Sequence, residues 1–323
     1  MTLPIALTSG DPAGVGPEIA YKAYAALKNE LSFFVIGDRR HFPNCVEISN
    51  PSRAKCADGL PLLHMDFAAP AEAGKANHKN ATDVIASIET AVGFALSGIV
   101  SAVCTLPINK QVLVKGANFS HSGHTEFLAE LSGVDKSVMM LKAPELAVVP
   151  VTIHVALKDV KTILTSDLLE HTLRITHDAM ARDFGLDLPR IVVSGVNPHA
   201  GEGGLMGHEE ITLISPVINK LRAQGFNIVG PLPADTMFHT TARTKYDVAV
   251  CMYHDQALIP IKTLNFSASV NVTLGLPFIR TSPDHGTAFD IAGQGLANPN
   301  SLIEALRLAR DMAKARVVND AKY

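Results

Sequence analysis

Short apolar runs alternate with longer amphipathic segments along most of this chain. The runs with the length of a buried strand are PIALTS, FFVIG, VSAVCT, VMML, LAVVPVTIH, RIVVSG, DVAVCM and ASVNVTL. Between them, the apolar spacing predicts helices over residues 18–27, 81–96, 125–131, 167–184, 209–224 and 301–315. Buried strands that alternate with amphipathic helices indicate an α/β protein, in which helices cover both faces of a mostly parallel sheet.

The first predicted strand leads through the loop GDPAGVGP into a helix that begins after Pro17, a residue suited to the first helical position. Strand, glycine loop and helix in this order are typical of an α/β protein. The chain nevertheless contains neither G-x-G-x-x-G nor G-x-x-x-x-G-K-[ST]. The loop therefore carries neither of the two common nucleotide-binding motifs.

Composition narrows the class of protein further. The 323 residues suffice for one large α/β unit or two lobes, and a hydrophobic content of 47% is typical of a globular protein. The formal net charge is −3, Trp is absent, and no basic cluster alternates with aromatic residues, so the sequence does not favour nucleic-acid binding.

The N-terminal sequence and the spacing of the cysteines indicate in which cell compartment the protein is expected. The N-terminus MTLPIALTSG lacks the basic region and long apolar stretch of a signal peptide, and residues 90–109 are uncharged but interrupted by Gly, Ser and Pro. We therefore expect no membrane span and a cytoplasmic protein. Four cysteines without C-x-x-C spacing are predicted to be reduced thiols.

Three histidines occur where predicted strands stop. His154 follows LAVVPVTI, His199 follows RIVVSGVNP, and His254 follows DVAVCMY. Because parallel strands end at one edge of a sheet, these imidazoles are expected in one crevice, where they predict a metal site. Three protein ligands leave coordination positions open for substrate. Imidazole ligands favour zinc, with Co²⁺ or Mg²⁺ as alternatives.

Two further segments point to an anionic ligand. SGHTEF (residues 122–127) is typical of a helix entrance, where Ser122 or Thr125 caps the backbone, or where His124 and Thr125 donate hydrogen bonds to an anion. Lys262, Asn271 and Arg280 interrupt an otherwise apolar stretch. Two cations and an amide near the histidines suit a phosphate or carboxylate, although each cation alone also fits a side chain that reaches solvent.

The segment DHGTAFDIAGQGLANP, residues 284–299, is rich in glycine and other small residues. It fits a surface turn, or a backbone that approaches a nucleotide closely. Both interpretations remain open at this point.

Together these segments make the chain resemble the 4-hydroxythreonine-4-phosphate dehydrogenase family of vitamin B6 biosynthesis. The matching segments are GDPAGVGPE, SGHTEF, NPHAGEGG, LPADT, YHDQALIPIK, VNVTLGLPFIRTS and DHGTA. The tail HGTAFDIAGQGLANP is also similar to the adenine-side loop of isocitrate and isopropylmalate dehydrogenases, which bind NAD without the usual glycine motif. The resemblance implies that fold, with two lobes around a cleft, approximately residues 1–120 plus 270–323 and residues 121–269.

The resemblance also implies a reaction and a set of site residues. The reaction is NAD(P)-dependent oxidation of 4-phosphooxy-L-threonine at C3, followed by decarboxylation to 3-amino-2-oxopropyl phosphate. It implies a homodimer whose active site takes residues from both subunits. The resemblance implies that the metal is bound by His154, His199 and His254. It implies that the substrate is bound by His124, Thr125, Lys262, Asn271 and Arg280. The cofactor is then bound by His285, Gly286, Thr287, Ala288 and Asn298.

Two uncertainties concern the chemistry. Asp235 in LPADT is the candidate proton acceptor, with Lys262 as an alternative, although an aspartate at a helix start also serves as a cap. Relatives act on phosphorylated threonates or erythronates, and some on aromatic cis-diols. Other classes that fit the same residues are a metal-dependent hydrolase and a phosphometabolite-binding protein without activity.

Overall fold

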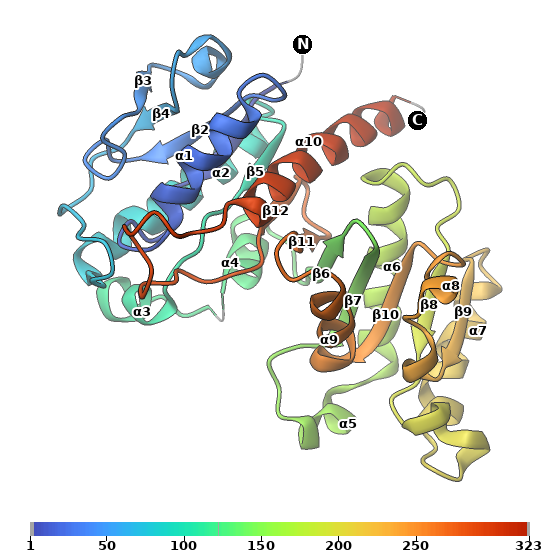
Figure 1. Cartoon of the computed structure of the whole chain (residues 1–323). Coiled ribbons are helices and arrows are strands. Elements are labelled where there is room, and N and C mark those ends of the chain that lie inside the picture. The colour runs from blue at the N-terminus through green and yellow to red at the C-terminus, as the bar shows by residue number, and fades with distance from the viewer. Residues whose placement is uncertain (1–2, 122, 322–323) are drawn as a thin grey trace. The chain divides into compact units, whose positions relative to one another are not determined.

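The computed structural model describes residues 3–121 and 123–321, which form two compact units (Figure 1). The first unit comprises Met1–Ser137 and Val270–Lys314, and the second comprises Val138–Ser269 and Ala315–Tyr323. Helix α4 (His124–Leu131) lies in the first unit because its Phe127 and Leu128 pack into that unit's hydrophobic core. The sequence-based expectation had started the other lobe at residue 121.

Seven strands form the sheet of the first unit, in the order β3-β4-β2-β1-β5-β12-β11. Their bounds are β1 Ile5–Thr8, β2 Phe33–Gly37, β3 Val46–Ile48, β4 Pro61–His64, β5 Ala102–Cys104, β11 Val270–Leu274 and β12 Arg280–Pro283. All neighbours pair in parallel except β11, which runs antiparallel to β12.

Helices cover both faces of this sheet. They are α1 Gly16–Leu27, α2 Ala81–Leu96, α3 Lys110–Ala117, α4 and α10 Asn300–Asp320. Side chains alternate along a strand, so Phe34 and Ile36 pack in one core cluster with Ile88 of α2. Phe33 and Val35 point to the opposite face and are equally buried, under the apolar sides of α1 and α10 (Figure 1).

The second unit repeats this layering around five strands in the order β6-β7-β10-β8-β9. Strands β6 Val138–Ala143 and β7 Leu146–Thr152 form an antiparallel pair, whereas β7, β10 Val248–Tyr253, β8 Ile191–Ser194 and β9 Ile228–Leu232 are parallel. The helices are α5 Val160–Ile163, α6 Ser166–Arg182, α7 Ser215–Arg222, α8 Thr240–Arg243 and α9 His254–Leu264. Helix α9 packs over β7 and β10, where Ile261 joins Val148 and Cys251 in the core.

Short helical turns complete the chain. The 3-10 turns are η1 Pro51–Cys56, η2 His78–Asn80, η3 Leu157–Asp159, η4 Pro198–Gly204 and η6 Ala234–Thr236, and η5 Glu210–Ile214 is a π-helical turn. The helix expected over residues 209–224 is therefore divided into η5 and α7, and Pro216 stands near the start of α7.

The prediction of an α/β protein with a mostly parallel, helix-covered sheet is confirmed. The four cysteines are free thiols, as expected. Within residues 3–121 and 123–321, helices that are both long and apolar enough to cross a membrane do not occur. No helix was expected directly after His254, where the chain forms helix α9 despite Pro260 inside it.

Candidate functional site

The three strand-end histidines all lie in the second unit, at the carboxyl ends of neighbouring parallel strands. β10 pairs with β7 on one side and with β8 on the other. His254 directly follows β10 and begins α9, and His154 lies two residues beyond β7. The ring centroids of His154 and His254 are 5.9 Å apart, so the structure brings these two imidazoles together.

The third histidine does not join this pair within one chain. In the described part of the chain, no three side chains of the His, Cys, Asp or Glu type are grouped to hold one metal ion. His199 is exposed in the turn η4, which follows β8. A site with three histidine ligands therefore needs His199 from another source or another position of its loop.

The backbone around the histidines is unusual. His154 has φ 53°, and His199, Ala200 and Glu202 have φ values of 52°, 52° and 42°, all in the left-handed region. Side chains other than glycine lose roughly 1–2 kcal/mol per residue in this region, so neighbouring contacts have to hold the turn. Such strain is typical of a functional loop.

Glu210 holds the start of this loop from inside. Its carboxylate is buried and accepts hydrogen bonds from the backbone N–H groups of Val196 and Asn197, both at 2.8 Å, and from Asn197 Nδ2 at 2.9 Å. A Cβ atom on Gly201 would approach Glu210 Oε2 to 2.6 Å, so only glycine fits there. Sequence reasoning missed Glu210, which stood inside a predicted helix.

Glu209 supports the same asparagine from the outside. It accepts a hydrogen bond from Asn197 Nδ2 at 2.8 Å and pairs with Lys161 at 2.6 Å. The hydrogen bonds from Lys161 and Asn197 lower the pKa of the Glu209 carboxyl to about 2, so it stays ionised. The loop that carries His199 is thus anchored by two carboxylates.

A carboxylate also orients His254. Asp255 Oδ1 lies 2.7 Å from His254 Nδ1. A carboxylate only accepts hydrogen bonds, so the proton of the imidazole is on Nδ1, and Nε2 is free to bind a metal. Gln256 fixes the strand ends beneath, since it accepts from Met252 N and Ser194 Oγ and donates to Gly195 O. The pair of imidazoles therefore has the support that metal ligands usually have.

The predicted anion-binding residues of the first unit surround Arg280. This guanidinium is only 3% exposed and donates to Thr105 Oγ1 at 2.6 Å, Thr273 Oγ1 at 2.9 Å and Asn271 Oδ1 at 3.3 Å. Burial lowers its pKa to about 10, which leaves it charged at neutral pH. Thr105 and Thr273 were not predicted, because their sequence positions give no sign of Arg280.

His124 complements this cation. Burial, and then the charge of Arg280, lower the pKa of the His124 imidazole well below its usual value, so the ring is neutral at pH 7. Both His124 Nε2 and Arg280 Nε are buried and have no hydrogen-bond partner within residues 3–121 and 123–321. Buried polar atoms are nearly always satisfied, so a ligand that supplies both partners fits this place.

Helix α4 begins differently from the capping hypothesis. Gly123 is the N-cap residue and none of the described side chains caps the helix, so Thr125 is not the cap, and it lies in the first turn beside His124. The alternative cap, Ser122, lies outside the described residues. The anion-binding role of Thr125 stays a prediction.

The predicted cofactor segment lies against the first glycine loop, also within the first unit. Thr287 O accepts from Val15 N at 2.9 Å, and a Cβ on Gly14 would approach that oxygen to 2.8 Å. Glu18 accepts from Ala297 N at 2.8 Å. GDPAGVGP and DHGTAFDIAGQGLANP thus form one continuous surface, and Glu18 is a contact that sequence reasoning missed.

Within that segment, His285 Nε2 is buried without a partner and Ala288 has φ 43°. Lys22 donates to the carbonyls of Gly295 and Ala297 and closes the far end of the segment. Gly286 has open space where a Cβ would stand. The Asn298 side chain accepts from Asn300 N and so caps the start of α10.

The two proton-transfer candidates lie in the second unit with the histidines. Asp235 is exposed, not a buried cap, and lines a pocket of about 460 Å³ together with Tyr253 and Asp255. Lys262 is half-buried on α9, and its Nζ lies 5.3 Å from the ring centroid of Phe266. The site residues therefore form two sets, one for each unit.

Comparison with known proteins identifies the family of the chain. The model of the family "Pyridoxal phosphate biosynthetic protein PdxA" matches residues 13–309. A 4-hydroxythreonine-4-phosphate dehydrogenase of Ruegeria sp. (strain TM1040) is 55% identical over 317 residues, which are 97% of each chain.

Two solved structures are similar along nearly the whole chain. One is a 4-hydroxythreonine-4-phosphate dehydrogenase from Klebsiella pneumoniae, with a TM-score of 0.88, 36% identity, and coverage of 97% of this chain and 100% of that chain. The other is a terephthalate 1,2-cis-dihydrodiol dehydrogenase from Burkholderia xenovorans LB400, with a TM-score of 0.67, 29% identity, and coverage of 96% and 98%. The chain belongs to the pyridoxal phosphate biosynthetic protein PdxA family.

Proposed function

We propose that this protein is a 4-hydroxythreonine-4-phosphate dehydrogenase. It oxidises 4-phosphooxy-L-threonine at C3 with NAD or NADP and releases carbon dioxide, which leaves 3-amino-2-oxopropyl phosphate. The identity of 55% to a relative of that name over 97% of the chain carries the proposal. The two sets of site residues supply the chemistry that this reaction needs.

The histidine pair fits a divalent metal. His154 and His254 present imidazoles 5.9 Å apart, and Asp255 leaves Nε2 of His254 available. Zinc suits such ligands, with Co²⁺ and Mg²⁺ as alternatives. When bound, the metal supplies Lewis acidity at the substrate oxygens, and the nicotinamide accepts the electrons of C3.

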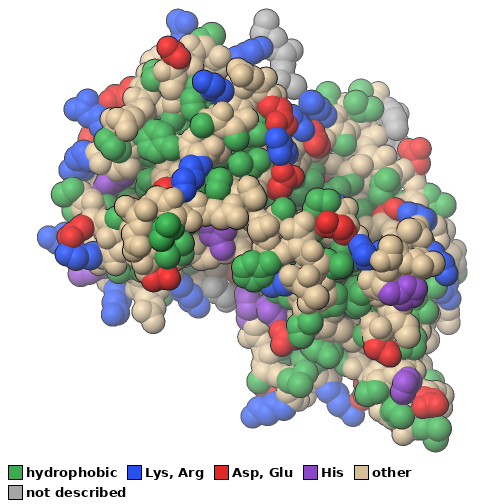
Figure 2. All heavy atoms as spheres, in the orientation of Figure 1, with side chains coloured by type: hydrophobic (Ala, Val, Ile, Leu, Met, Phe, Trp, Pro, Cys, Tyr) green, Lys and Arg blue, Asp and Glu red, His purple; other side chains and the backbone are tan. Residues whose placement is uncertain are grey.

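We assign the third ligand to His199 of the partner subunit in a homodimer. Its loop does not bring it to the pair within one chain. Each histidine is followed in sequence by exposed apolar side chains: Leu157 is 72% exposed, Leu205 is 85% exposed, and Ile259 is 62% exposed. Figure 2 shows histidine side chains at the surface of the second unit with apolar side chains beside them. Apolar patches of this kind are typical of an interface.

In this proposal the phosphate of the substrate is bound by Arg280, together with His124, Thr125 and Asn271. Arg280 keeps its charge and has Nε without a partner, so it donates to an anion. Because the His124 imidazole is neutral, it adds one hydrogen bond to the phosphate and leaves the charge pairing to Arg280. Lys262, in the other unit, is the second cation of this proposal.

Proton transfer at the C3 hydroxyl falls to Asp235 or Lys262, because both lie in the unit that carries the histidines. Asp235 is exposed in a pocket that Asp255 also lines. The variants Asp235→Asn and Lys262→Met distinguish the two, because a proton acceptor has to be deprotonated and its pKa therefore sets the acidic limb of the kcat profile, which only the variant of the true acceptor loses.

The cofactor is assigned to the surface formed by residues 285–298 and the first glycine loop. Small residues there allow a nucleotide to approach the backbone, and His285 Nε2 offers a buried polar atom without a partner. The free state of all four cysteines supports a reducing compartment, the cytoplasm.

The test is a panel of substrates with the purified protein. We expect reduction of NAD or NADP with 4-phosphooxy-L-threonine and zinc, and none after chelation of the metal. Phosphorylated threonate and erythronate and an aromatic cis-diol serve as competing substrates. Turnover of one of these in place of 4-phosphooxy-L-threonine would reassign the substrate, and metal-independent activity would contradict the proposed site.

A further inference from the structure

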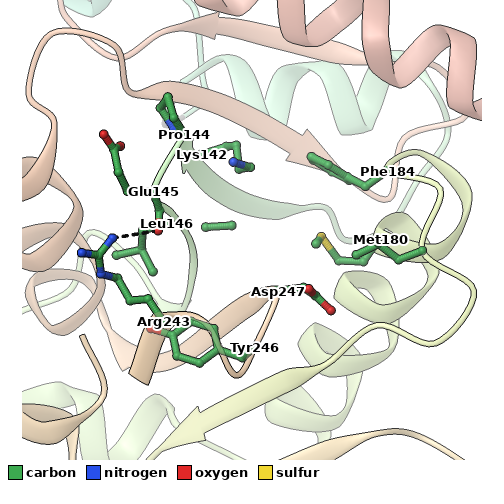
Figure 3. Close-up of a pocket in the computed structure, with 11 residues that line it drawn as sticks. Lys142, Pro144, Glu145, Leu146, Met180, Phe184, Arg243, Tyr246 and Asp247 are labelled. Atoms are coloured by element: carbon green, nitrogen blue, oxygen red, sulfur yellow. Dashed lines mark hydrogen bonds between the residues drawn. The ribbon is translucent and has the colours of Figure 1, made fainter. Parts of the chain in front are cut away.

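A pocket that the proposed reaction does not use lies within the second unit. Its volume is about 310 Å³. It is lined by the turn between β6 and β7, the end of α6 with the loop after it, and the segment that leads into β10. Figure 3 shows Arg243 and Glu145 on one side of this pocket and Met180 and Phe184 on the opposite side.

Two cations of the pocket have no ion-pair partner among the described residues. Lys142 Nζ donates to Ala143 O, and Arg243 donates to the carbonyls of Glu145 and Phe238. The side chain of Lys142 is largely withdrawn from water, and this burial lowers the pKa of its amino group. Backbone carbonyls satisfy donors but leave the positive charges uncompensated.

The acidic residues of the pocket neutralise these charges only in part, although the charge of Glu145 does act on Lys142. Asp247 is fully engaged by Arg190, which donates to both of its oxygens, at 2.7 Å to Oδ1 and 3.2 Å to Oδ2. Glu145 accepts only a long hydrogen bond from Asn265, at 3.4 Å. Counting Arg190 with Asp247, the pocket has two cations and one available carboxylate, so it favours an anion.

The remaining lining is apolar. Leu146, Ala147, Met180, Phe184 and Leu186 form the walls, and the Tyr246 ring lies beside Arg243, with its hydroxyl donating to Met237 O. Lys142 and Ala147 are cross-strand partners in the β6–β7 pair and share one face of the sheet. A ligand for this pocket therefore needs an apolar body as well as a negative charge.

The pocket is distant from the histidine pair. It lies at the amino end of β7 and β10, near Leu146 and Asp247, whereas His154 and His254 follow the carboxyl ends of the same strands. Seven residues of strand extend about 20 Å. The pocket and the proposed metal site thus occupy opposite ends of the same two strands.

We propose that this pocket is a second binding site, for a small organic anion with one phosphate or carboxylate group on an apolar body. Lys142 and Arg243 bind the charged group, and the apolar walls pack against the body. The volume is in the range of small-molecule sites. The proposal does not depend on the proposed function, since none of its residues belongs to the catalytic site.

Calorimetric titration of the full-length protein with phenyl phosphate and with phenylacetate tests the proposal and separates the two kinds of charged group. We expect at least one of these probes to bind at millimolar or lower concentration, and inorganic phosphate to bind more weakly. Lys142→Met should weaken binding at least about tenfold, as expected for loss of a charged hydrogen-bond partner. Lys245→Met, an exposed cation two residues from Arg243, is the matched control and should leave the affinity unchanged.

Two further variants keep the test decisive. Ala147→Leu should reduce binding by filling the pocket without a change of charge, which covers the case in which Lys142→Met does not fold. His124→Ala should leave binding intact. Loss of binding in His124→Ala with normal binding in Lys142→Met would place the probe at the proposed substrate site and overturn the proposal. Failure of both probes to bind the wild-type protein would overturn it as well.

Discussion

Glu210 and Asn197 are joined by two hydrogen bonds: one carboxylate oxygen of Glu210 accepts from Asn197 N at 2.8 Å, and the other accepts from Asn197 Nδ2 at 2.9 Å. Asn197 stands two residues before His199, at the entrance to a turn with left-handed backbone angles. A buried carboxylate that supports a strained turn in this way determines where His199 is presented. Glu210 is therefore a positioning residue for the proposed metal site.

Glu210→Gln should lower zinc affinity. The amide keeps the size of the side chain but offers one acceptor oxygen, so either the two backbone N–H groups that share Oε1 or the Asn197 Nδ2 group bound to Oε2 loses its acceptor. Substitution of a residue that orients a ligand typically lowers metal affinity 10–100-fold. Competition titration with a zinc chelator measures this change. Glu209→Gln is the matched control with a smaller expected effect, because Asn197 retains Glu210; unchanged zinc affinity in Glu210→Gln would exclude the positioning role.

Thr105→Val should raise KM for the phosphorylated substrate about tenfold with a smaller change in kcat. The substitution removes the oxygen that accepts from Arg280 at 2.6 Å and leaves a buried guanidinium donor unsatisfied, at a typical loss of 1–3 kcal/mol. Steady-state kinetics with substrate and cofactor varied separately measures the effect. Thr281→Val, which removes a hydroxyl that donates to Ala305 O of helix α10, should reduce stability alone.

Stability should fall in mild acid because of His124. Its pKa in the folded protein lies well below the ordinary histidine value of about 6.5, so the unfolded chain binds more protons at acidic pH. The free energy of unfolding then decreases as pH falls below about 6.5, by up to about 1.4 kcal/mol per pH unit for one such group. Urea unfolding of wild type and His124→Gln between pH 7 and 5 measures the difference. An identical pH dependence in both proteins would contradict the assigned pKa.

The strand-end rule predicted the histidine site only in part. It placed His154, His199 and His254 at one edge of a sheet, and the parallel order β7-β10-β8 agrees. It did not predict that only two of the rings meet. That outcome depends on the left-handed turn at His199, which is set by Glu210 eleven residues later in the chain and not by the local apolar pattern.

The burial of Arg280 and the helix α9 could not be predicted from the sequence, because both depend on contacts between distant segments. Arg280 was expected to reach a ligand, but its burial depends on Thr105, which lies 175 residues earlier in the chain. Helix α9, which contains Pro260, was not predicted. Packing of Ala257, Leu258 and Ile261 against the sheet stabilises this helix, and such contacts are invisible in a local pattern.

Glu18→Ala should weaken NAD binding about tenfold without affecting metal binding. Glu18 accepts from the backbone N–H groups of Ala297 and Gly295, at 2.8 and 3.2 Å, so its removal releases the far end of the proposed cofactor segment. Calorimetry with NAD and, separately, with zinc distinguishes the two effects. Glu89→Ala, an exposed glutamate on α2 of the same unit, is the control. Equal losses for both ligands would indicate general damage instead.

Leu205→Glu should separate the proposed dimer and remove its metal. Leu205 is 85% exposed directly after the η4 turn that carries His199, and a charge at the centre of an apolar contact opposes association. Light scattering after gel filtration should show a monomer, and metal analysis should show zinc lost together with NADH formation, since the proposed site takes His199 of the partner subunit. Leu188→Glu, an equally apolar exposed position before β8 and 57% exposed, should remain dimeric and active. A monomeric Leu205→Glu protein that retained full zinc would show that one chain completes the site by itself, and a stable dimer would place the interface elsewhere.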